Sequence, residues 1–457
     1  TEIYTLSLHD ALPILTMKKR FLFTIIAAVG AIAFLHAQVA PTVFAQDFTS
    51  GLIGINIDAD GNIWATENGT GNDDGRITII DQQGNKTVFM TGLPSTFIQA
   101  AGEIVGSYRT YQRPDNKVLI VVGEGDHDLS ETLLIVDKSD FSPGNPLTLE
   151  DVELVIDHGA FIHGLGFVQS NPFNVEWDTE GNMYIADAGA NSIVKWEAAT
   201  GDFSIVKTLD RFPNPLPFGP PMVDPVPTKA LRKPDGTFYV SQLTGFPFLP
   251  GAANVHNLDA EGNLSVHAEG FTCLTDMHFD PTDGNLCVMQ FGVFGDVGGT
   301  LNFILGSAAV IKLMPDGSRD TIAQGIGGLA PSFAFDGDGN LYVADLVFGQ
   351  ILKYNLLSST QETPLAKTQL TVFPNPASEQ VHIEYELTRE APVTMGIYDL
   401  GGRLLASFNE GNMPSGKHRL TWNGTMAGGR VAQNGTYIYR LLAGESLSAG
   451  LISWQRP

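Results

Sequence analysis

Apolar and polar positions alternate in a unit that recurs through most of the chain. In FDGDGNLYVAD (335–345), an apolar lead-in and a Gly-Asn turn precede a strand in which Leu341 and Val343 alternate with Tyr342 and Ala344. Asp-Gly or Gly-Asn between two alternating apolar runs supplies the positive φ angles that a tight hairpin needs. Each copy of this unit therefore predicts a β-hairpin.

Similar units begin at Asp58, Trp177, Leu231 and Phe279, with a degraded one at Arg113. Successive turn positions are separated by 55, 65, 55, 48 and 55 residues. These positions are Gly61, Asn116, Gly181, Gly236, Gly284 and Gly339. Small antiparallel sheets that recur in this way stack radially and close into a ring. The repeats predict an all-β, six-bladed β-propeller over residues 47–356, with one blade completed by strands from both ends of the segment.

A polar linker at 357–369 separates this region from a different pattern at 370–457. Turn signals such as Asn423-Gly424 and Asn434-Gly435 divide that segment into short apolar runs. The runs are 381–387, 393–398, 404–408, 418–422, 437–442 and 447–454. Short strands at this density predict a small β-sandwich of immunoglobulin type.

The beginning of the chain has the pattern of a signal peptide at 17–46. Lys18, Lys19 and Arg20 precede an apolar run at 21–35, and a cleavage-like Val-Phe-Ala at 43–45 puts the mature start near Gln46. The run is short for a bilayer, so a permanent membrane span is the weaker alternative. Residues 1–16 bear no relation to the rest of the chain and resemble a sequencing read-through.

The composition and charge of the chain limit the kinds of partner that it can bind. The 457 residues include 50 Gly and 26 Pro and carry a formal charge of −24, which leaves no basic surface for nucleic acid. Only Cys273 and Cys287 are present. A hairpin turning at 281–284 pairs Cys287 with a position near His278, so a disulfide between the cysteines is disfavoured.

Two segments of the repeat region resemble the ScyD/ScyE family of propeller proteins. They are SNPFNVEWDTEGNMYIADAGANSIVKW (170–196) and VPTKALRKPDGTFYVSQLTGFPFLPGAANV (226–255), of which ADAGAN and LTGFPF are the most specific parts. The resemblance covers about Ser50 to Tyr354. It implies an exported propeller of NHL/SMP-30-like architecture, linked by neighbourhood to pigment biosynthesis in some members.

The C-terminal segment resembles a type IX secretion system sorting domain of type A. The motifs stand in the order FPNPAS (373–378), IYDLGGRLL (397–405), GKHRLTWNG and NGTYIYRLLAG. The resemblance implies that the type IX secretion machinery is a partner and that the protein passes the periplasm to become secreted or bound to the outer cell surface. The alternative is an ordinary carbohydrate-binding or spacer sandwich, because such folds host many functions.

Polar residues end the second half of five repeated hairpins, where the strands of a ring are expected to converge. They are Glu67, Asp187, Gln242, Gln290 and Asp345, and Val122 interrupts the series. Convergent carboxylate and amide oxygens would suit Ca²⁺. The alternative is that each side chain caps its own loop by accepting from nearby backbone amides.

Two long loops after these strands are rich in aromatic residues: Phe246 and Phe248 in one, Phe291 and Phe294 in the other. We expect them to line a ligand-binding groove above the axis, although packing between adjacent loops would explain them too. No histidine has metal-ligand spacing, and neither a Gly-x-Ser-x-Gly elbow nor a phosphate loop is present. No catalytic residue is therefore assigned.

The sequence leaves two hypotheses of function. One is a binding or scaffold propeller with an unidentified small-molecule or protein ligand. The other is a metal-dependent hydrolase or lyase of the lactonase or streptogramin-lyase propeller type. A metal site of the second kind needs convergent oxygens without gaps, whereas Gln242 and Gln290 replace carboxylates and Val122 leaves one blade empty. The pattern favours binding.

Overall fold

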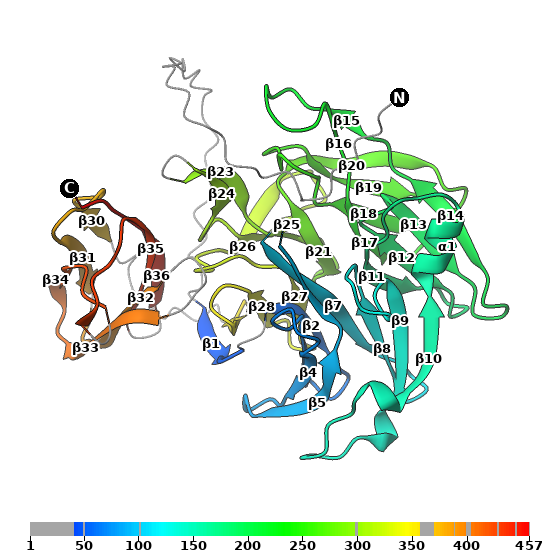
Figure 1. Cartoon of the computed structure of the whole chain (residues 1–457), viewed down its shortest axis with the longest axis horizontal. Coiled ribbons are helices and arrows are strands. Elements are labelled where there is room, and N and C mark those ends of the chain that lie inside the picture. Colours follow the sequence, from blue (N-terminus) through cyan, green and yellow to red (C-terminus); the bar gives the residue numbers. More distant parts are fainter. Residues whose placement is uncertain are drawn as a thin grey trace.

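The computed structural model describes residues 41–456 except 49–50, 100–101, 298–299, 357–369, 388, 399–403, 427–428 and 444–445. The expected read-through, most of the expected signal peptide and the linker lie outside the described residues. The described residues form a β-propeller and a separate β-sandwich (Figure 1). The predicted all-β fold class is confirmed.

Five sheets of the propeller each come from one continuous stretch of chain, and their strands pair antiparallel in sequence order. The strands of the first two are β2 (Leu52–Ile57), β3 (Ile63–Glu67), β4 (Gly75–Ile80), β5 (Lys86–Leu93), then β6 (Ser95–Ile98), β7 (Glu103–Gln112), β8 (Lys117–Val122), β9 (Thr132–Asp137) and β10 (Val152–Asp157). Two short 3-10 turns, η1 (Lys138–Asp140) and η2 (Leu149–Asp151), precede β10, and the helix α1 (His158–Gly164) follows it.

The next three sheets repeat this plan with insertions between strands. Their strands are β11 (Pro172–Trp177), β12 (Met183–Asp187), β13 (Ser192–Trp196), β14 (Phe203–Thr208); β17 (Pro227–Arg232), β18 (Phe238–Gln242), β19 (Ala253–Leu258), β20 (Leu264–Phe271); and β21 (Leu274–Phe279), β22 (Leu286–Gln290), β25 (Ala309–Leu313), β26 (Arg319–Ala323). Two hairpins stand outside the blades: β15 (Phe212–Pro213) with β16 (Met222–Val223), and β23 (Val293–Val297) with β24 (Thr300–Ile304).

The sixth sheet joins the two ends of the segment. Its order is β27 (Phe333–Phe335), β28 (Leu341–Asp345), β29 (Gln350–Tyr354) and then β1 (Thr42–Ala45) from the beginning of the chain. Thr42 pairs with Lys353, and the Phe44 ring packs edge-on against Tyr342 with centroids 5.1 Å apart. One sheet is indeed completed from both ends of the chain, but its N-terminal strand lies at 42–45, before the segment 47–356 to which the ring was assigned. Because β1 lies within the segment assigned to the signal peptide, a mature chain starting at Gln46 would lack it.

The turns of the repeats follow from their Asp and Gly residues. Asp58 Oδ1 accepts hydrogen bonds from the backbone N–H groups of Asp60 and Asn62, at 3.0 and 2.9 Å, and Gly61 adopts φ +80°. A side chain that bonds to backbone two and four residues on fixes the turn without help from the rest of the fold. Asp336 makes the same two bonds in the last repeat, which explains why the unit is legible in the sequence.

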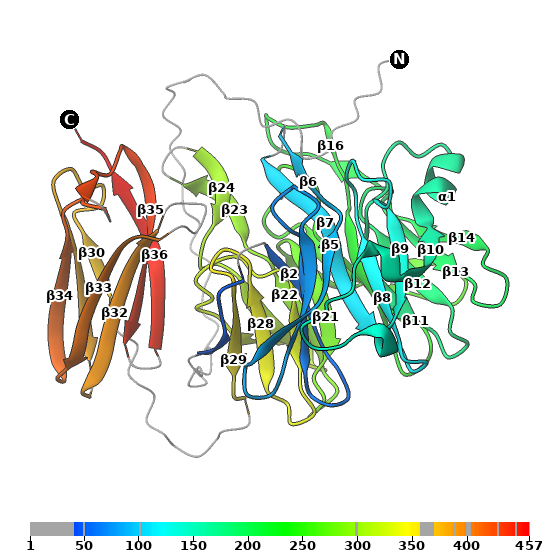
Figure 2. The same ribbon diagram turned by 60° about the horizontal axis from the view of Figure 1, so that its bottom comes forward.

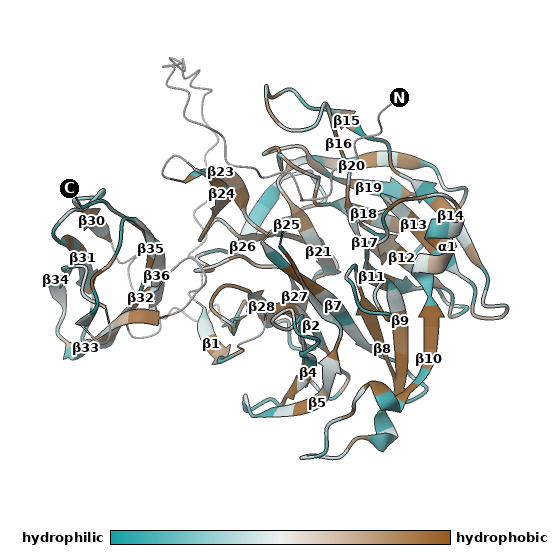
Figure 3. Cartoon of the chain, in the orientation of Figure 1, coloured by the Kyte–Doolittle hydropathy of each residue, from teal (hydrophilic) through white to brown (hydrophobic). Residues whose placement is uncertain are grey.

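The core consists of apolar layers between neighbouring blades. Trp64 and Ile77 of the first blade pack with Val118 and Ile120 of the next, and all four are fully buried. Figure 3 shows the hydrophobic residues on the strands and the hydrophilic ones mainly at the turns. Each blade can therefore bury its faces only with neighbours on both sides, which a closed ring provides.

The cysteines lie as the register predicts. Cys287 is directly opposite His278, and Cys273 and Cys287 are both free and buried. Within the described residues, no helix has the length and apolar character needed to cross a bilayer.

The C-terminal unit is a two-layered sandwich (Figure 2). Trp422 and Trp454 pack between the layers with ring centroids 4.9 Å apart. One layer is β30 (Thr371–Phe373), β31 (Val381–Leu387) and β34 (Gly416–Trp422); the other is β33 (Leu404–Met413), β32 (Ala391–Tyr398), β35 (Gly435–Ala443) and β36 (Ser446–Trp454). The six strands expected in this segment are all confirmed.

Removing β1 should destabilise the whole ring. A chain that starts at Asp47 should melt at least about 5 °C below one that starts at Ala40, since β29 loses its partner and Tyr342 loses the Phe44 ring. Differential scanning calorimetry of the two chains measures this. Equal melting temperatures would show that β1 adds nothing to closure.

Candidate functional site: an axial cavity above a charged layer

The axis of the propeller is lined by one strand of each sheet, which is the first strand in five sheets and β7, after the short β6, in the second. These strands, β2, β7, β11, β17, β21 and β27, contact one another around the ring. Side chains link them directly: Thr228 Oγ1 donates to the carbonyl of Leu274 at 2.9 Å, and the Tyr111 hydroxyl donates to Asn174 Oδ1 at 2.6 Å. The residues of these strands therefore decide what fills the axis.

One repeat position forms the floor of a cavity. In every repeat, the residue five positions before the one that opens the hairpin turn lines the same cavity. The volume of this cavity is about 800 Å³. These floor residues are Ile53, Tyr108, Phe173, Thr228, Thr275 and Pro331. Their equivalence by repeat position places the cavity on the axis.

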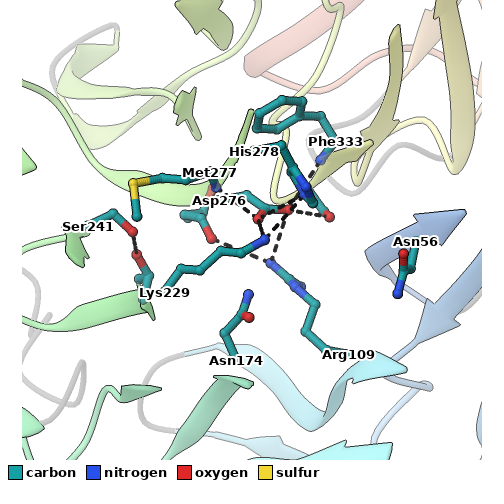
Figure 4. A network of polar contacts seen from close by, with 12 residues as sticks. Asn56, Arg109, Asn174, Lys229, Ser241, Asp276, Met277, His278 and Phe333 are labelled. Carbon is teal, nitrogen blue, oxygen red and sulfur yellow. Dashed lines mark hydrogen bonds and ion pairs between the residues drawn. The ribbon is translucent and has the colours of Figure 1, made fainter. Parts of the chain in front are cut away.

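The next position in each strand forms what we call the axial layer, beneath that floor. Its members are Gly54, Arg109, Asn174, Lys229, Asp276 and Ser332. Figure 4 shows four of them, Arg109, Asn174, Lys229 and Asp276, converging from different strands. All six residues are buried.

Asp276 is the centre of the axial layer. Its Oδ1 lies 2.8 Å from Lys229 Nζ and its Oδ2 accepts from Ser332 Oγ at 2.7 Å. His278 Nε2 is 3.4 Å from Oδ1, and an Arg109 nitrogen is 4.0 Å from Oδ2. Burial by itself raises the pKa of Asp276, but Lys229, His278 and Arg109 outweigh it and hold that pKa well below its usual range. The carboxylate therefore stays ionised inside the protein.

Arg109 closes the axis under the cavity floor. Its guanidinium donates to the carbonyls of Ile53, Tyr108 and Pro331 at 2.7, 2.9 and 3.1 Å. It also lies over the Phe173 ring, 4.7 Å from the centroid. A Cβ on Gly54 would clash with the Tyr108 carbonyl and come within 3.2 Å of the guanidinium, so this layer needs a glycine in the first blade.

The cavity walls come from the loops that follow the second strands. In five blades, the residue just after the strand lines the cavity. These residues are Asn68, Ala188, Leu243, Phe291 and Leu346. Each immediately follows one of the five polar residues singled out in the sequence.

None of those five polar residues lines the cavity. Because side chains alternate between the two sides of a strand, the position before a wall residue points away from the axis and into its own blade. Glu67 accepts two bonds from Arg76, at 2.6 and 2.7 Å, and Asp187 lies 2.8 Å from His158 Nε2 while also accepting from the amide N–H groups of Asn171 and Ala190.

The remaining three are also held locally. Gln242 Oε1 accepts from His256 Nε2 at 2.9 Å, and Gln290 Nε2 donates to the Ser307 carbonyl at 3.0 Å. Asp345 accepts from Gln350 Nε2 at 3.1 Å, and burial raises the pKa of Asp345 to about 6. Gln350 Oε1 in turn accepts from Arg440 of the sandwich at 2.7 Å.

The expected aromatic residues gather at one side of the cavity. Phe246, Phe248 and Phe291 line it, together with Phe218 and Phe303; we call these five residues the phenylalanine wall. Phe294 packs behind the wall, with its ring centroid 5.2 Å from those of Phe248 and Phe303. These phenylalanines therefore both pack against neighbouring loops and line the cavity, so the two alternatives given for them occur together.

Sequence reasoning missed the axial layer and the carboxylates Glu103 and Glu124, which line the opposite side of the cavity. Burial raises the pKa of Glu103 to about 7, and burial together with the charge of Glu103 raises that of Glu124 to about 7. A signal for the axial layer was present: a polar residue recurs four positions before the turn, inside runs that otherwise read as core. Nothing in the repeat marks the glutamates.

The described residues thus define a β-propeller with an axial cavity, followed by an immunoglobulin-like domain. Residues 373–445 match the model of the FlgD Ig-like domain. No curated protein matches the chain.

Solved structures resemble it in fold alone. A Bacteroides thetaiotaomicron protein of unknown function is 16% identical over 70% of this chain and 76% of its own, with a TM-score of 0.45. Regucalcin, a calcium-binding protein from Agrobacterium tumefaciens, is 18% identical over 70% and 94%, with a TM-score of 0.41. PorZ, a surface component of the type IX secretion system of Porphyromonas gingivalis, is 14% identical; 89% of this chain covers 60% of PorZ, with a TM-score of 0.36.

The Asp276→Asn variant should lose about 3–5 kcal/mol of unfolding free energy at pH 7, because Lys229 is left buried without its counter-charge. The folded pKa of Asp276 is depressed, so its contribution is present above about pH 4 and is lost as the pH falls below that value. The difference between variant and wild type should therefore shrink towards pH 3. Urea unfolding at several pH values measures it.

The control is Asp338→Asn in an exposed turn, which should change stability by less than about 0.5 kcal/mol. If Asp276→Asn behaved like this control, the axial layer would not hold the ring together.

Proposed function

We propose that the propeller binds a small molecule in its axial cavity and that the C-terminal domain directs export through the type IX secretion machinery. The observation that carries the first part is the cavity itself, about 800 Å³ in volume, with a floor made by one repeat position from every blade. Ligand pockets of about 300–1,000 Å³ with mainly apolar walls and a few placed polar groups are typical of small-molecule sites.

The axial layer below the floor favours a cavity in which a ligand binds over a channel through which a molecule passes along the axis of the ring. Arg109 fills the axis with a guanidinium whose bonds go to floor carbonyls, and Asp276 ties it to the neighbouring blades. A ligand enters and leaves on the loop side, where the loops of the blades supply the walls. Specificity then resides in loops that the ring holds in place.

The alternative, a metal-dependent hydrolase or lyase, has less support. Among the described residues no group of three or more His, Cys, Asp or Glu side chains is arranged to hold a metal ion. The oxygens of Glu67, Asp187 and Asp345, which were candidates for Ca²⁺, accept hydrogen bonds within their own blades or loops. Binding without metal-dependent chemistry is the function that the geometry favours.

The proposal of export is supported by the resemblance of the C-terminal motifs to a type A sorting domain and by the signal-peptide pattern. The match of residues 373–445 to an Ig-like domain agrees with the β-sandwich fold expected of such a sorting domain. We further propose that the leader is cleaved upstream of Thr42, because β1 completes the last blade. Ala37 is a small residue that would suit a signal peptidase there.

Binding is tested with the neutral fluorescent probe N-phenyl-1-naphthylamine. The double variant Phe246→Ala/Phe291→Ala should bind it about tenfold more weakly than the unchanged chain, since two rings of the phenylalanine wall are lost. Phe97→Ala is the matched control, because Phe97 is 52% exposed and does not line the cavity. Equal loss in both variants, or no binding to the unchanged chain, would contradict the proposal.

Export is tested by deleting residues 370–457. Two units with separate cores should be independent, so the truncated chain should remain a folded propeller, with its melting temperature changed by no more than about 2 °C, but accumulate in the periplasm. Fractionation followed by immunoblotting measures its location. Arrival of the truncated chain at the cell surface would rule out a sorting role.

A further inference from the structure

The charges around the cavity are unbalanced. Its described lining residues include three carboxylates, those of Glu103, Glu124 and Asp224, and no Lys, Arg or His. Asp224 is neutralised by Arg211, whose Nε lies 2.6 Å from Asp224 Oδ1. Neither glutamate forms an ion pair with a cation in the described part of the chain, so two acidic groups remain available to a ligand.

The two glutamates come from adjacent strands of one blade. Glu103 begins β7 and Glu124 follows β8, which pairs with β7 from Ser107 opposite Val122. Glu124 is positioned by Asn171, whose Nδ2 donates to Glu124 Oε1 at 3.0 Å and whose Oδ1 accepts from the Glu124 amide at 3.1 Å. The two carboxylates therefore stand on one side of the cavity, and that of Glu124 is held in place by Asn171.

Two other lining residues have unpartnered polar atoms. Asn68 and Thr244 are 5% and 0% exposed, and Asn68 Oδ1 and Thr244 Oγ1 have no hydrogen-bond partner. A buried polar atom without a partner costs stability unless something binds it. When ionised, the two glutamates can only accept hydrogen bonds, and Asn68 Oδ1 is also an acceptor, whereas the Thr244 hydroxyl can donate or accept. The described cavity lining thus offers unpartnered acceptors and negative charge but no positive charge.

The opposite side of the cavity is the phenylalanine wall. Aromatic faces attract cations as well as apolar groups, because the ring quadrupole is negative at its face. Acidic groups on one side and aromatic faces on the other are complementary to the same kind of molecule.

We propose that the cavity binds an organic cation with an apolar body, with its positive group held by Glu103 and Glu124 and its apolar part packed on the phenylalanine wall. This inference rests on the proposed binding function and names its ligand class. An anionic ligand would have to approach two unpaired carboxylates on a chain of net charge −24. The nearest cation, Arg109, is beneath the floor with its donors directed to carbonyls.

The same site makes affinity depend on pH. A carboxyl group with a pKa of about 7 is mostly protonated at pH 6 and mostly ionised at pH 8, so a cation that requires one ionised carboxylate binds roughly tenfold more tightly at pH 8. Because the two glutamates interact, the titration belongs to the pair. The other titratable groups facing them are Tyr108 and Arg109 of β7, Glu131 with its partner His163, and Asp187 with its partner His158.

The test compares two molecules of the same shape. Phenyltrimethylammonium and tert-butylbenzene differ only in the charged nitrogen, and each is titrated into the full-length protein by calorimetry and as a competitor of N-phenyl-1-naphthylamine. The cation should bind at least about tenfold more tightly than the neutral molecule at pH 8, and this preference should fall about tenfold at pH 6. Binding should release protons, seen as a dependence of the heat on the ionisation enthalpy of the buffer.

The variants are Glu103→Gln/Glu124→Gln, which keeps shape and removes charge, and Glu261→Gln, a control in an exposed turn. The double variant should lose the preference for the cation and its pH dependence but still bind the neutral probe, which also shows that it is folded. Equal affinity for the two molecules, or a preference that survives in the double variant, overturns the inference while the binding function stands. Failure of every probe, the neutral one included, overturns both.

Discussion

The carboxylate of Asp276 is the interaction on which the ring depends. It lies on blade five, binds Lys229 of blade four at 2.8 Å and Ser332 of blade six at 2.7 Å, and balances Arg109 of blade two. An ionised group in an apolar interior is costly unless it is paired and hydrogen-bonded, and here the partners come from other blades. The cost of burying the charge is therefore met only when the blades are assembled around the axis, which couples the inner layer to closure. Apolar packing between blades also stabilises the ring, but it does not require particular residues to meet at the axis.

The repeat explains why the cavity and this layer are adjacent. In five blades the fifth residue before the turn is the extra residue at a register shift in the first strand of the hairpin, so it departs from the regular alternation of side chains along that strand. A propeller places equivalent residues of every blade at the same height along the axis. The fifth residue therefore forms the floor, and the fourth forms the charged layer. A different residue type occupies the fourth position in each blade, with Gly54 the smallest and Arg109 the largest. The types differ because these residues meet at one axis and must fit one another there. The turns, by contrast, are made locally and keep nearly the same residues from blade to blade.

This difference decides how much the sequence could predict. The hairpins and the sandwich strands follow from local turn chemistry and period-two alternation, which are visible without any alignment. The closing strand β1 was missed, because residues 43–45 were interpreted as a cleavage motif of the signal peptide. The predicted site residues Glu67, Asp187 and Asp345 do not line the cavity, whereas the residue after each of them does. The hairpin unit shows where a strand ends but does not show which of its two strands is innermost. Glu103 and Glu124 were missed because their proximity arises from strand pairing and loop folding that no local pattern encodes.

A closed floor also separates stability from recognition. The axial layer links the blades beneath the floor, whereas loops build the walls, so if the cavity binds a ligand as we propose, a change at Phe246 or Glu124 should alter what it accepts without removing the contact between Asp276 and Lys229. Arg109 lies under the floor residues, 4.0 Å from Asp276, and it donates hydrogen bonds to the carbonyls of Ile53, Tyr108 and Pro331. The glutamates stand among the described cavity lining, which includes no Lys, Arg or His. The charged side chains are therefore divided between two levels, with the cations in the axial layer and the carboxylates of Glu103 and Glu124 in the binding space.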